Sequence, residues 1–427
     1  MSTLSLAVVA FFVLGFGLVS KRIQTTIVTA PMVFVLFGVV MGPIGLGLVD
    51  VTLDSPGVRL LAELTLVLVL FTDAARIDLA RLRREHNIPL RLLGIGLPLT
   101  VLAGVVAGAA LLGELSLWEV LVLAIILSPT DAALGQAVVS SPRVPVRIRQ
   151  ALNVESGLND GLALPLLLFA ISCATMAEHA NEGAFWLRFA MLQVVLGPLV
   201  GAAVGYFGGR LVAWGRRAGW MSEAFGDLAA LGLALLAYAG AEVVGGNGFI
   251  AAFAAGLTLG NTARSLCSSV YEFAEAEGQL LMLLSFVVFG AVLVGPALDG
   301  LGPATLLYAL ASLTLVRMVP VWLSLTGLGL EPSTRAFIGW FGPRGIASIL
   351  YGLLLLEGSG LEQGGTVFSV TMLTILLSVV LHGITAWPAV RWYGRWADNM
   401  KDEPDMPEMQ PVSEMPVRLS YDESLEL

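Results

Sequence analysis

Charged residues are scarce in this sequence. Asp, Glu, Lys and Arg make up 13% of its 427 residues, whereas hydrophobic residues make up 57% and the mean hydropathy is +0.85. A soluble domain of this composition has too little polar surface to cover itself, which excludes that class. We therefore expect an all-α polytopic membrane protein, because helices satisfy their own backbone polar groups inside a bilayer.

Cysteine is also nearly absent. Cys173 and Cys267 both lie in or beside apolar segments, so we expect packing residues and no disulfide framework. Glycine and proline are abundant, with 48 and 20 residues, and transmembrane helices use both for close packing and for breaks. The net charge of −9 does not indicate a type of partner, because the acidic residues fall largely in the expected outer loops and in the C-terminal tail. Nothing in the sequence suggests binding to nucleic acid.

Thirteen apolar segments are long enough, or nearly so, for a bilayer core that needs about 20 helical residues. They span residues 4–20, 26–48, 58–75, 90–112, 118–139, 150–173, 185–209, 225–242, 246–261, 279–298, 303–326, 336–356 and 366–392. From residue 398 the chain is rich in Asp, Glu, Pro and Met, which is typical of disorder. We expect a transmembrane domain over 1–397 and a disordered cytoplasmic tail over 398–427.

The basic residues predict the orientation of these segments. At least one Lys or Arg follows every odd-numbered segment, whereas only Arg59 and Arg188 follow even-numbered ones. Cytoplasmic loops collect Lys and Arg. We therefore expect a multi-pass protein with its N-terminus outside and its C-terminus in the cytoplasm.

Carboxylates occur inside the apolar segments, where an unpaired charge is costly. Asp131, Glu155 and Asp160 lie near the middle of two consecutive apolar runs, and Asp73 lies deep in an earlier one. At 1.5 Å per residue, Asp131 is roughly 20 Å from the outer end of its segment and Asp160 roughly 16 Å from the inner end of the next. In a core of about 30 Å these depths are similar, so Asp73, Asp131 and Asp160 are predicted to converge on one site.

The residues around these acids suit a cation. Pro129 lacks a backbone donor and disfavours helix at Ser128, so the segment is expected to unwind near Thr130 and free its carbonyl oxygen. Hard cations prefer oxygen ligands. Ser156 and Asp160, four residues apart, share one helix face.

Two buried arginines and a second break complete the pattern. Arg317 and Arg344 lie at a depth similar to that of Glu155, so an ion pair is expected, but depth does not choose between the two arginines. Gly342, Pro343 and Gly345 predict a second interruption. Two interrupted segments are typical of crossed helices in an inverted repeat.

These residues resemble a family, the monovalent cation/proton antiporters, in the bacterial NhaP-type Na⁺/H⁺ branch related to the animal sodium–proton exchangers. The specific part of the match is Thr130-Asp131, Glu155-Ser156-Gly157-Leu158-Asn159-Asp160 and Pro343-Arg344-Gly345. One departure is visible, because many relatives have Pro just after the position of Asp131, whereas Ala132 follows here.

The resemblance implies a role for each site residue. It implies that Asp160 binds either Na⁺ or H⁺, with Asp131, Ser156, the Thr130 carbonyl and Asp73 as further ligands. It also implies that Glu155 pairs with Arg317, that Arg344 lies near the unwound crossing, and that the Asn159-Asp160 order marks electroneutral exchange.

The resemblance further implies a transporter rather than an enzyme, with no cofactor. It would exchange Na⁺, or Li⁺ or K⁺, for H⁺ by alternating access, as a homodimer among the lipids of the bacterial inner membrane. Core helices over about 90–173 and 303–392 would move against a dimerising scaffold. Two rival functions remain. A passive cation channel would also need acids and broken helices, but the sequence contains no recognisable selectivity-filter repeat. An intramembrane aspartyl protease would leave Ser156, Asn159 and the arginines without a role.

Overall fold

Helices form nearly all of the described structure. The computed structural model of the chain describes residues 3–24, 26–52, 55–84, 87–132, 134–178, 183–263, 267–356, 361–400, 406–410 and 412. Over these ranges there is no strand, which confirms the prediction of an all-α protein. Seven helices within them are long and apolar enough to cross a membrane, and five shorter apolar helices accompany them.

The first half of the chain contains α1 to α11. These helices are α1 (Thr3–Gln24), α2 (Ala30–Met41), α3 (Pro56–Arg76), α4 (Leu79–Arg84), α5 (Asn87–Arg91), η1 (Leu92–Gly96), α6 (Leu97–Leu111), α7 (Leu117–Ile126), α8 (Gln136–Val139), α9 (Val146–Glu178), α10 (Gly183–Ala203), η2 (Val204–Gly208) and α11 (Gly209–Arg217). Most predicted segments correspond to one helix, but the segment 118–139 is divided into α7 and α8.

The second half contains α12 to α20. These helices are α12 (Glu223–Val243), α13 (Gly248–Thr262), α14 (Cys267–Val288), η4 (Phe289–Leu293), α15 (Val294–Asp299), α16 (Pro303–Leu313), α17 (Leu315–Ser324), α18 (Pro332–Trp340), α19 (Ile346–Leu356), α20 (Gly364–Asn399) and the short η5 (Pro407–Met409). The segment 336–356 is divided into α18 and α19.

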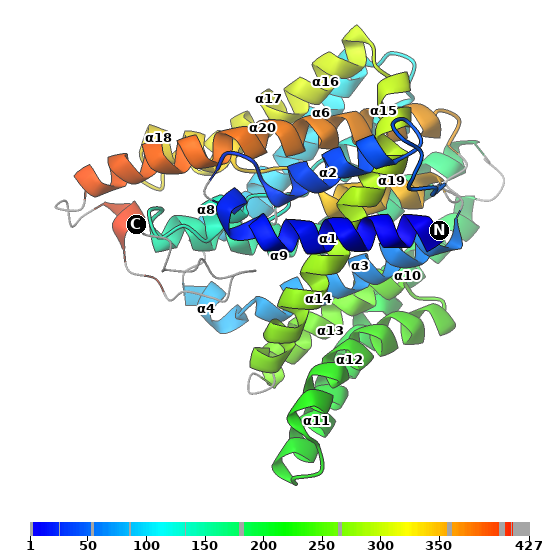
Figure 1. Cartoon of the computed structure of the whole chain (residues 1–427), viewed down its shortest axis with the longest axis vertical. Helices are drawn as coiled ribbons and strands as arrows, with labels where there is room; N and C mark the ends of the chain where they lie inside the picture. The colour runs from blue at the N-terminus through cyan, green and yellow to red at the C-terminus, as the bar shows by residue number, and fades with distance from the viewer. Residues whose placement is uncertain are drawn as a thin grey trace.

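The long helices α9 and α20 pack against the helices of the divided segments. With 33 and 36 residues they are roughly 50 Å long, more than a bilayer core requires. Figure 1 shows α20, in orange, running along the molecule with α16 and α17 nearby, whereas α11 and α12 lie at the opposite extremity. Both α7 and α19 contact α9 or α20, so the long helices support the interrupted ones.

Close backbone contact joins α3 to α13. Gly256 and Gly260 of α13 lie directly against the carbonyl groups of Phe71 and Ala75 on α3, where any Cβ atom would collide with the backbone. Small residues four apart allow such an approach between transmembrane helices, whose association depends on packing rather than on the exclusion of water. Asp73 lies between these two contact points on α3.

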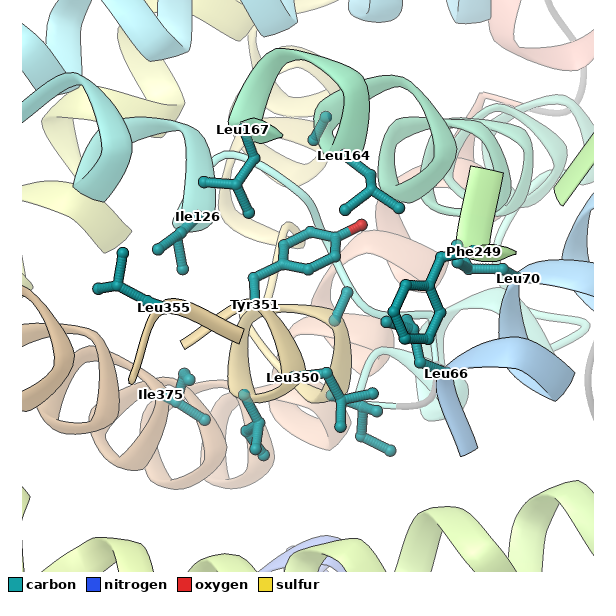
Figure 2. Close-up of a cluster of buried hydrophobic side chains, with 14 of the residues drawn as sticks. Leu66, Leu70, Ile126, Leu164, Leu167, Phe249, Leu350, Tyr351, Leu355 and Ile375 are labelled. Carbon is teal, nitrogen blue, oxygen red and sulfur yellow. The ribbon is translucent and has the colours of Figure 1, made fainter. Parts of the chain in front are cut away.

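An apolar cluster lies where α19 packs against α3, α7 and α9. Figure 2 shows Tyr351 of α19 among Leu164 and Leu167 of α9 and Ile126 of α7. Tyr351 is fully buried, and the same cluster extends through Leu66 and Leu70 of α3. This packing holds α3, α7, α9 and α19 together around the polar residues that lie between them.

Candidate functional site: two crossed helix breaks

The first break follows α7. Its N-terminus has a capping box between Ser116 and Glu119, and its helical hydrogen bonding ends at Ile126. Residues 127–135, apart from the undescribed residue 133, are not helical, as Pro129 predicts. The carbonyl oxygens of Pro129 and Thr130 consequently have no partner within a helix and are available to side chains.

The second break meets the first. Residues 341–345 separate α18 from α19, as the glycines and Pro343 predict. The backbone N–H of Asp131 donates to the Pro343 carbonyl at 2.8 Å. Ser348 Oγ of α19 donates to the Ile126 carbonyl, the last residue of α7, at 2.7 Å. The two interruptions therefore cross and exchange hydrogen bonds that helices would otherwise have satisfied internally.

The carboxylate of Asp131 caps the N-terminus of α19. Its Oδ2 accepts from the Ile346 N–H at 2.8 Å, and its negative charge lies at the positive end of the 11-residue helix. Gly345 permits this contact, because a Cβ atom there would overlap the same carboxylate oxygen. One oxygen of Asp131 is thus used to join the breaks.

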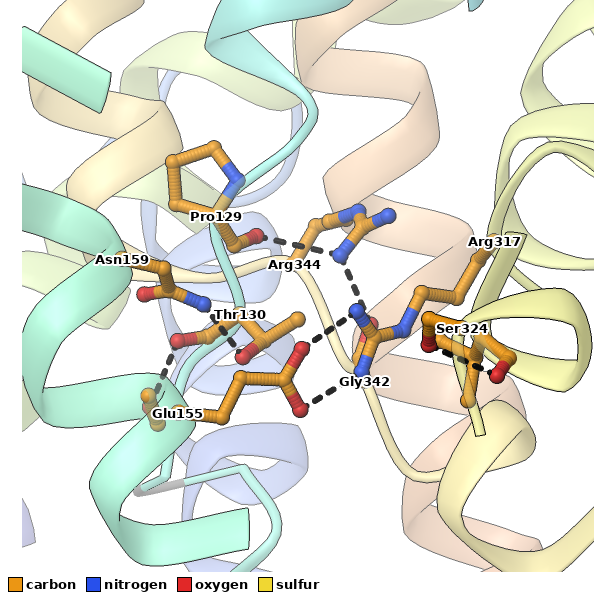
Figure 3. A network of polar contacts seen from close by, with 10 residues as sticks. Pro129, Thr130, Glu155, Asn159, Arg317, Ser324, Gly342 and Arg344 are labelled. Atoms are coloured by element: carbon orange, nitrogen blue, oxygen red, sulfur yellow. Dashed lines mark hydrogen bonds and ion pairs between the residues drawn. The ribbon is translucent and has the colours of Figure 1, made fainter. Parts of the chain in front are cut away.

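Arg344 supplies the complementary positive charge. The side chain is fully buried, and Nη1 donates to the carbonyls of Pro129 at 3.1 Å and Gly342 at 3.0 Å. These carbonyls lie just beyond the C-termini of α7 and α18, where helix dipoles favour a cation. Figure 3 shows the guanidinium between the two breaks. As expected, Arg344 lies at the unwound crossing.

Glu155 pairs with Arg317. The two nitrogens Nη1 and Nη2 donate to Oε1 and Oε2 at 2.6 and 2.8 Å, in a bidentate pair that Figure 3 shows beside Thr130. The structure therefore makes the choice that depth left open and confirms the pairing implied by the resemblance. With both carboxylate oxygens engaged by a guanidinium, Glu155 has a structural partner in place of a transported ion.

Thr130, Ser156 and Asn159 form one polar group. Ser156 Oγ donates to the freed Thr130 carbonyl at 2.6 Å, and Asn159 Nδ2 donates to Thr130 Oγ1 at 2.7 Å. Asn159 Oδ1 is buried and accepts no hydrogen bond from any residue that the structure describes. A cavity of about 10 Å³ adjoins this group, with Thr130, Asp131, Ser156 and Pro343 in its lining, close to the smallest space that admits one water molecule.

Asp160 and Asp73 lie near this group on α9 and α3. Asp160 is one helical turn beyond Ser156 and 6% exposed, and Tyr351 Oη donates to its backbone carbonyl at 2.7 Å. Asp73 lies against Gly157, the residue after Ser156. Among the described residues, however, no three acids, histidines or cysteines are grouped closely enough to hold a metal ion. The predicted convergence of Asp73, Asp131 and Asp160 is therefore not a three-carboxylate cluster in this conformation.

Several residues of the site were not expected from the sequence. Tyr351 fixes α9 against α19 through the Asp160 carbonyl, and Ser378 of α20 accepts from the Arg344 N–H at 2.7 Å. Both are ordinary polar residues in apolar segments, and no local spacing distinguishes them. Gly345 indicates a helix break in the sequence. It does not indicate the contact with Asp131, which is more than 200 residues away in the chain.

Crossed, interrupted helices around buried carboxylates define the class of this protein as a multi-pass membrane protein with the architecture of discontinuous-helix secondary transporters. A family model described as "Sodium/hydrogen exchanger, transmembrane" matches residues 7–392. The chain belongs to this family of sodium/hydrogen exchangers.

Known relatives agree with the assignment. The chain is 30% identical over 380 residues to the "K(+)/H(+) antiporter NhaP" of Alkalimonas amylolytica, covering 88% of this chain and 64% of the relative. It is 26% identical over 389 residues to the "Na(+)/H(+) antiporter" of Schizosaccharomyces pombe, covering 83% of each. The chain thus spans slightly less than two thirds of the length of the first relative.

A solved structure shares the fold. The sodium proton antiporter MjNhaP1 from Methanocaldococcus jannaschii superimposes with a TM-score of 0.73 at 21% sequence identity, covering 91% of this chain and 99% of that one. This likeness extends over most of the chain and shows a shared fold.

Proposed function

We propose that this protein exchanges a monovalent cation, Na⁺ or K⁺, for H⁺ across a membrane, with both ions competing for Asp160. The observation that carries the proposal is the hydrogen bond from Ser156 to the freed Thr130 carbonyl, one turn before Asp160. It gathers a carbonyl and a hydroxyl oxygen beside a buried carboxylate, which is a ligand set suited to a hard cation.

The mechanism follows from what Asp160 can carry. A carboxylate inside a membrane is costly unless a proton or a cation neutralises it. When a cation enters, it takes the Ser156 and Thr130 oxygens and displaces the proton, which leaves by the same opening. Once Asp160 carries a cation or a proton, the helices around it move and expose it to the other side of the membrane. Each cation therefore crosses only in exchange for H⁺.

Only one titrating carboxylate is assigned to this exchange. Glu155 is neutralised by Arg317, and the neighbour of Asp160 is the neutral amide Asn159, which donates to Thr130. One proton exchanged for one monovalent cation moves no net charge. This agrees with the electroneutral mode that the Asn159-Asp160 order implies.

The names of the relatives support exchange but include both ions. The bacterial relative is named for K⁺ and the yeast relative for Na⁺. Membership of an exchanger family favours coupled transport over the passive channel or the aspartyl protease considered for the sequence alone.

The remaining expectations are proposed on the same basis. The protein would lie in the bacterial inner membrane as a homodimer with its N-terminus outside. Helices within 90–173 and 303–392 would form the moving core, with Asp131 and Asp73 as further groups beside the ion path.

The first test is proton flux in proteoliposomes of the purified protein. Addition of Na⁺, and separately of K⁺, is expected to drive proton movement that does not change when the membrane potential is clamped. Asp160→Asn should abolish coupled flux, whereas Asp299→Asn, an exposed aspartate at the end of α15, should retain it. Retained flux in Asp160→Asn would remove Asp160 from the centre, and flux that depends on potential would overturn the one-to-one exchange.

A further inference from the structure

A short piece of the C-terminal tail is packed against the helices. Within the tail that was predicted to be disordered, residues 406–410 and Val412, here named the tail clasp, are described, and most of the remainder lies outside the described residues. Arg147, in the first turn of α9, donates through Nη1 to the Pro407 carbonyl and to Gln410 Oε1. Glu408 Oε1 accepts from the Glu331 N–H at 2.8 Å.

The contacts of Glu408 indicate a specific fit. Its side chain is only 1% exposed, although it belongs to a highly polar stretch. A buried carboxylate needs partners to offset the loss of water. Glu331 is the residue that precedes α18, and the N-terminus of that nine-residue helix carries partial positive charge. The acid of the clasp therefore lies where the fold favours an anion.

An apolar contact accompanies the polar ones. Val412 lines a cavity of about 20 Å³ together with Leu82 of α4, Ile88 and Pro89 of α5, and residues of α9. Pro407 lies against Gly329, so that a Cβ atom at Gly329 would be 3.3 Å from the proline ring. The clasp thus lies against α9, the start of α18, α4 and α5 at once.

The clasp lies against the face of α9 that is opposite to the cavity of about 10 Å³ at the crossing. Arg147, Ala151 and Val154 face the clasp, whereas Leu152 and Ser156 line the cavity at the crossing. At 100° per residue these two sets lie on opposite sides of the helix. Arg147 precedes Ser156 by nine residues, or about 13 Å along the axis. The hydrogen bonds from Arg147 to the clasp therefore lie about two and a half turns before Ser156 on the same helix.

We propose that the beginnings of α9 and α18 form a binding site for a Pro- and Glu-containing peptide, that the tail clasp occupies it, and that this occupancy restrains α9 and slows transport. The effect on transport rests on the exchange activity proposed above, whereas the peptide site does not.

The test compares the full chain with a chain ending at residue 405 and with Glu408→Ala. Hydrogen–deuterium exchange in the first turns of α9 and α18 is expected to become about fivefold faster in both variants. Glu114→Ala, an exposed acid in the α6–α7 loop, is the matched control and should exchange as the full chain does. A synthetic peptide of residues 406–412 at millimolar concentration, comparable to a tethered segment, should slow exchange again in the shortened chain.

Transport by the same proteins decides whether the clasp restrains α9. The maximal rate of cation-driven proton flux should rise about fivefold in the two variants, with an unchanged apparent KM. Unchanged hydrogen exchange would show that the clasp is not bound and would overturn the proposal. Faster hydrogen exchange with an unchanged transport rate would overturn the restraint. If even the full chain shows no flux, the proposed function fails, and the hydrogen exchange of α9 still decides whether the clasp restrains that helix.

Discussion

Glu155 and Arg317 lie at the centre of the molecule with 2% and 1% of their surfaces exposed. Removing either charge from water costs several kcal/mol, and only close pairing offsets that cost. Two short hydrogen bonds in a bidentate arrangement supply the pairing and also fix the rotation of α9 relative to α17. Since Ser156 follows Glu155 directly, this ion pair helps to place the hydroxyl against Thr130.

Breaking this ion pair is expected to destabilise the fold. Glu155→Gln leaves Arg317 charged and buried, so we expect a loss of about 3–5 kcal/mol and a lower midpoint of thermal unfolding in detergent. The charge exchange Glu155→Arg with Arg317→Glu should recover part of the loss. Glu114→Gln, at an exposed acid, is the control and should unfold as the unaltered protein does. Equal unfolding midpoints for Glu155→Gln and the unaltered protein would contradict a stabilising pair.

At the scale of helices, α20 supports both sides of the second break. The imidazole of His382 is 1% exposed, and Nε2 donates to the carbonyl of Trp340, the last residue of α18, at 2.9 Å. Nδ1 lies 3.2 Å from Ser378 Oγ, which accepts from the Arg344 N–H. His382 therefore belongs to a buried hydrogen-bonded chain that links the residues before and after the second break.

Loss of this support should weaken cation binding. In His382→Phe the Trp340 carbonyl loses its donor, and one hydrogen bond is worth about 1 kcal/mol, or about fivefold in affinity. We expect the apparent KM for the cation to rise by that factor with a nearly unchanged maximal rate, measured as proton flux in proteoliposomes. His382→Gln, which retains a donor, should recover part of the affinity, and Val380→Ala on the exposed face of α20 should have no effect. An unaltered KM in His382→Phe would show that the contact does not position the site.

At the scale of the whole molecule, the distribution of charge predicts the orientation in the membrane. The turn after α11 follows Arg216 and Arg217, whereas the turn after α6 contains Glu114 and no Lys or Arg. Because translocation of basic loops is disfavoured, these two turns are expected on opposite sides of the membrane.

Labelling from one side tests this orientation. In a chain whose Cys173 and Cys267 are replaced by alanine, Glu114→Cys is expected to react with an impermeant maleimide added outside intact cells. Ala218→Cys, in the turn after α11, should react only after the membrane is permeabilised. Labelling of both positions from outside would contradict the alternation of charge.

Much of the fold could be predicted because it follows from local properties of the chain. Long apolar runs indicated the helices, and Pro129 together with Pro343 indicated where two of them break. Boundaries were less predictable: α14 begins at Cys267, about twelve residues before the predicted apolar segment, because a helix can continue through polar residues of good helix propensity.

Residues that meet at the crossing were named from the sequence, but most of their contacts were not predicted. Depth placed Asp73, Asp131 and Asp160 at one level, yet Asp131 uses an oxygen to cap α19, and the described acids form no three-membered cluster. Depth along a helix axis says nothing about rotation around that axis, which side-chain packing sets.

The sequence by itself determined the membrane-embedded helical class, the two breaks and the identity of the buried charges, because each depends on hydrophobicity and backbone preferences within a few neighbouring residues. Only the tertiary structure decided that Arg317 rather than Arg344 binds Glu155, that Asp131 meets Ile346, and that the tail clasp reaches Arg147. These contacts join residues far apart in the chain, and their formation depends on how helices pack against one another.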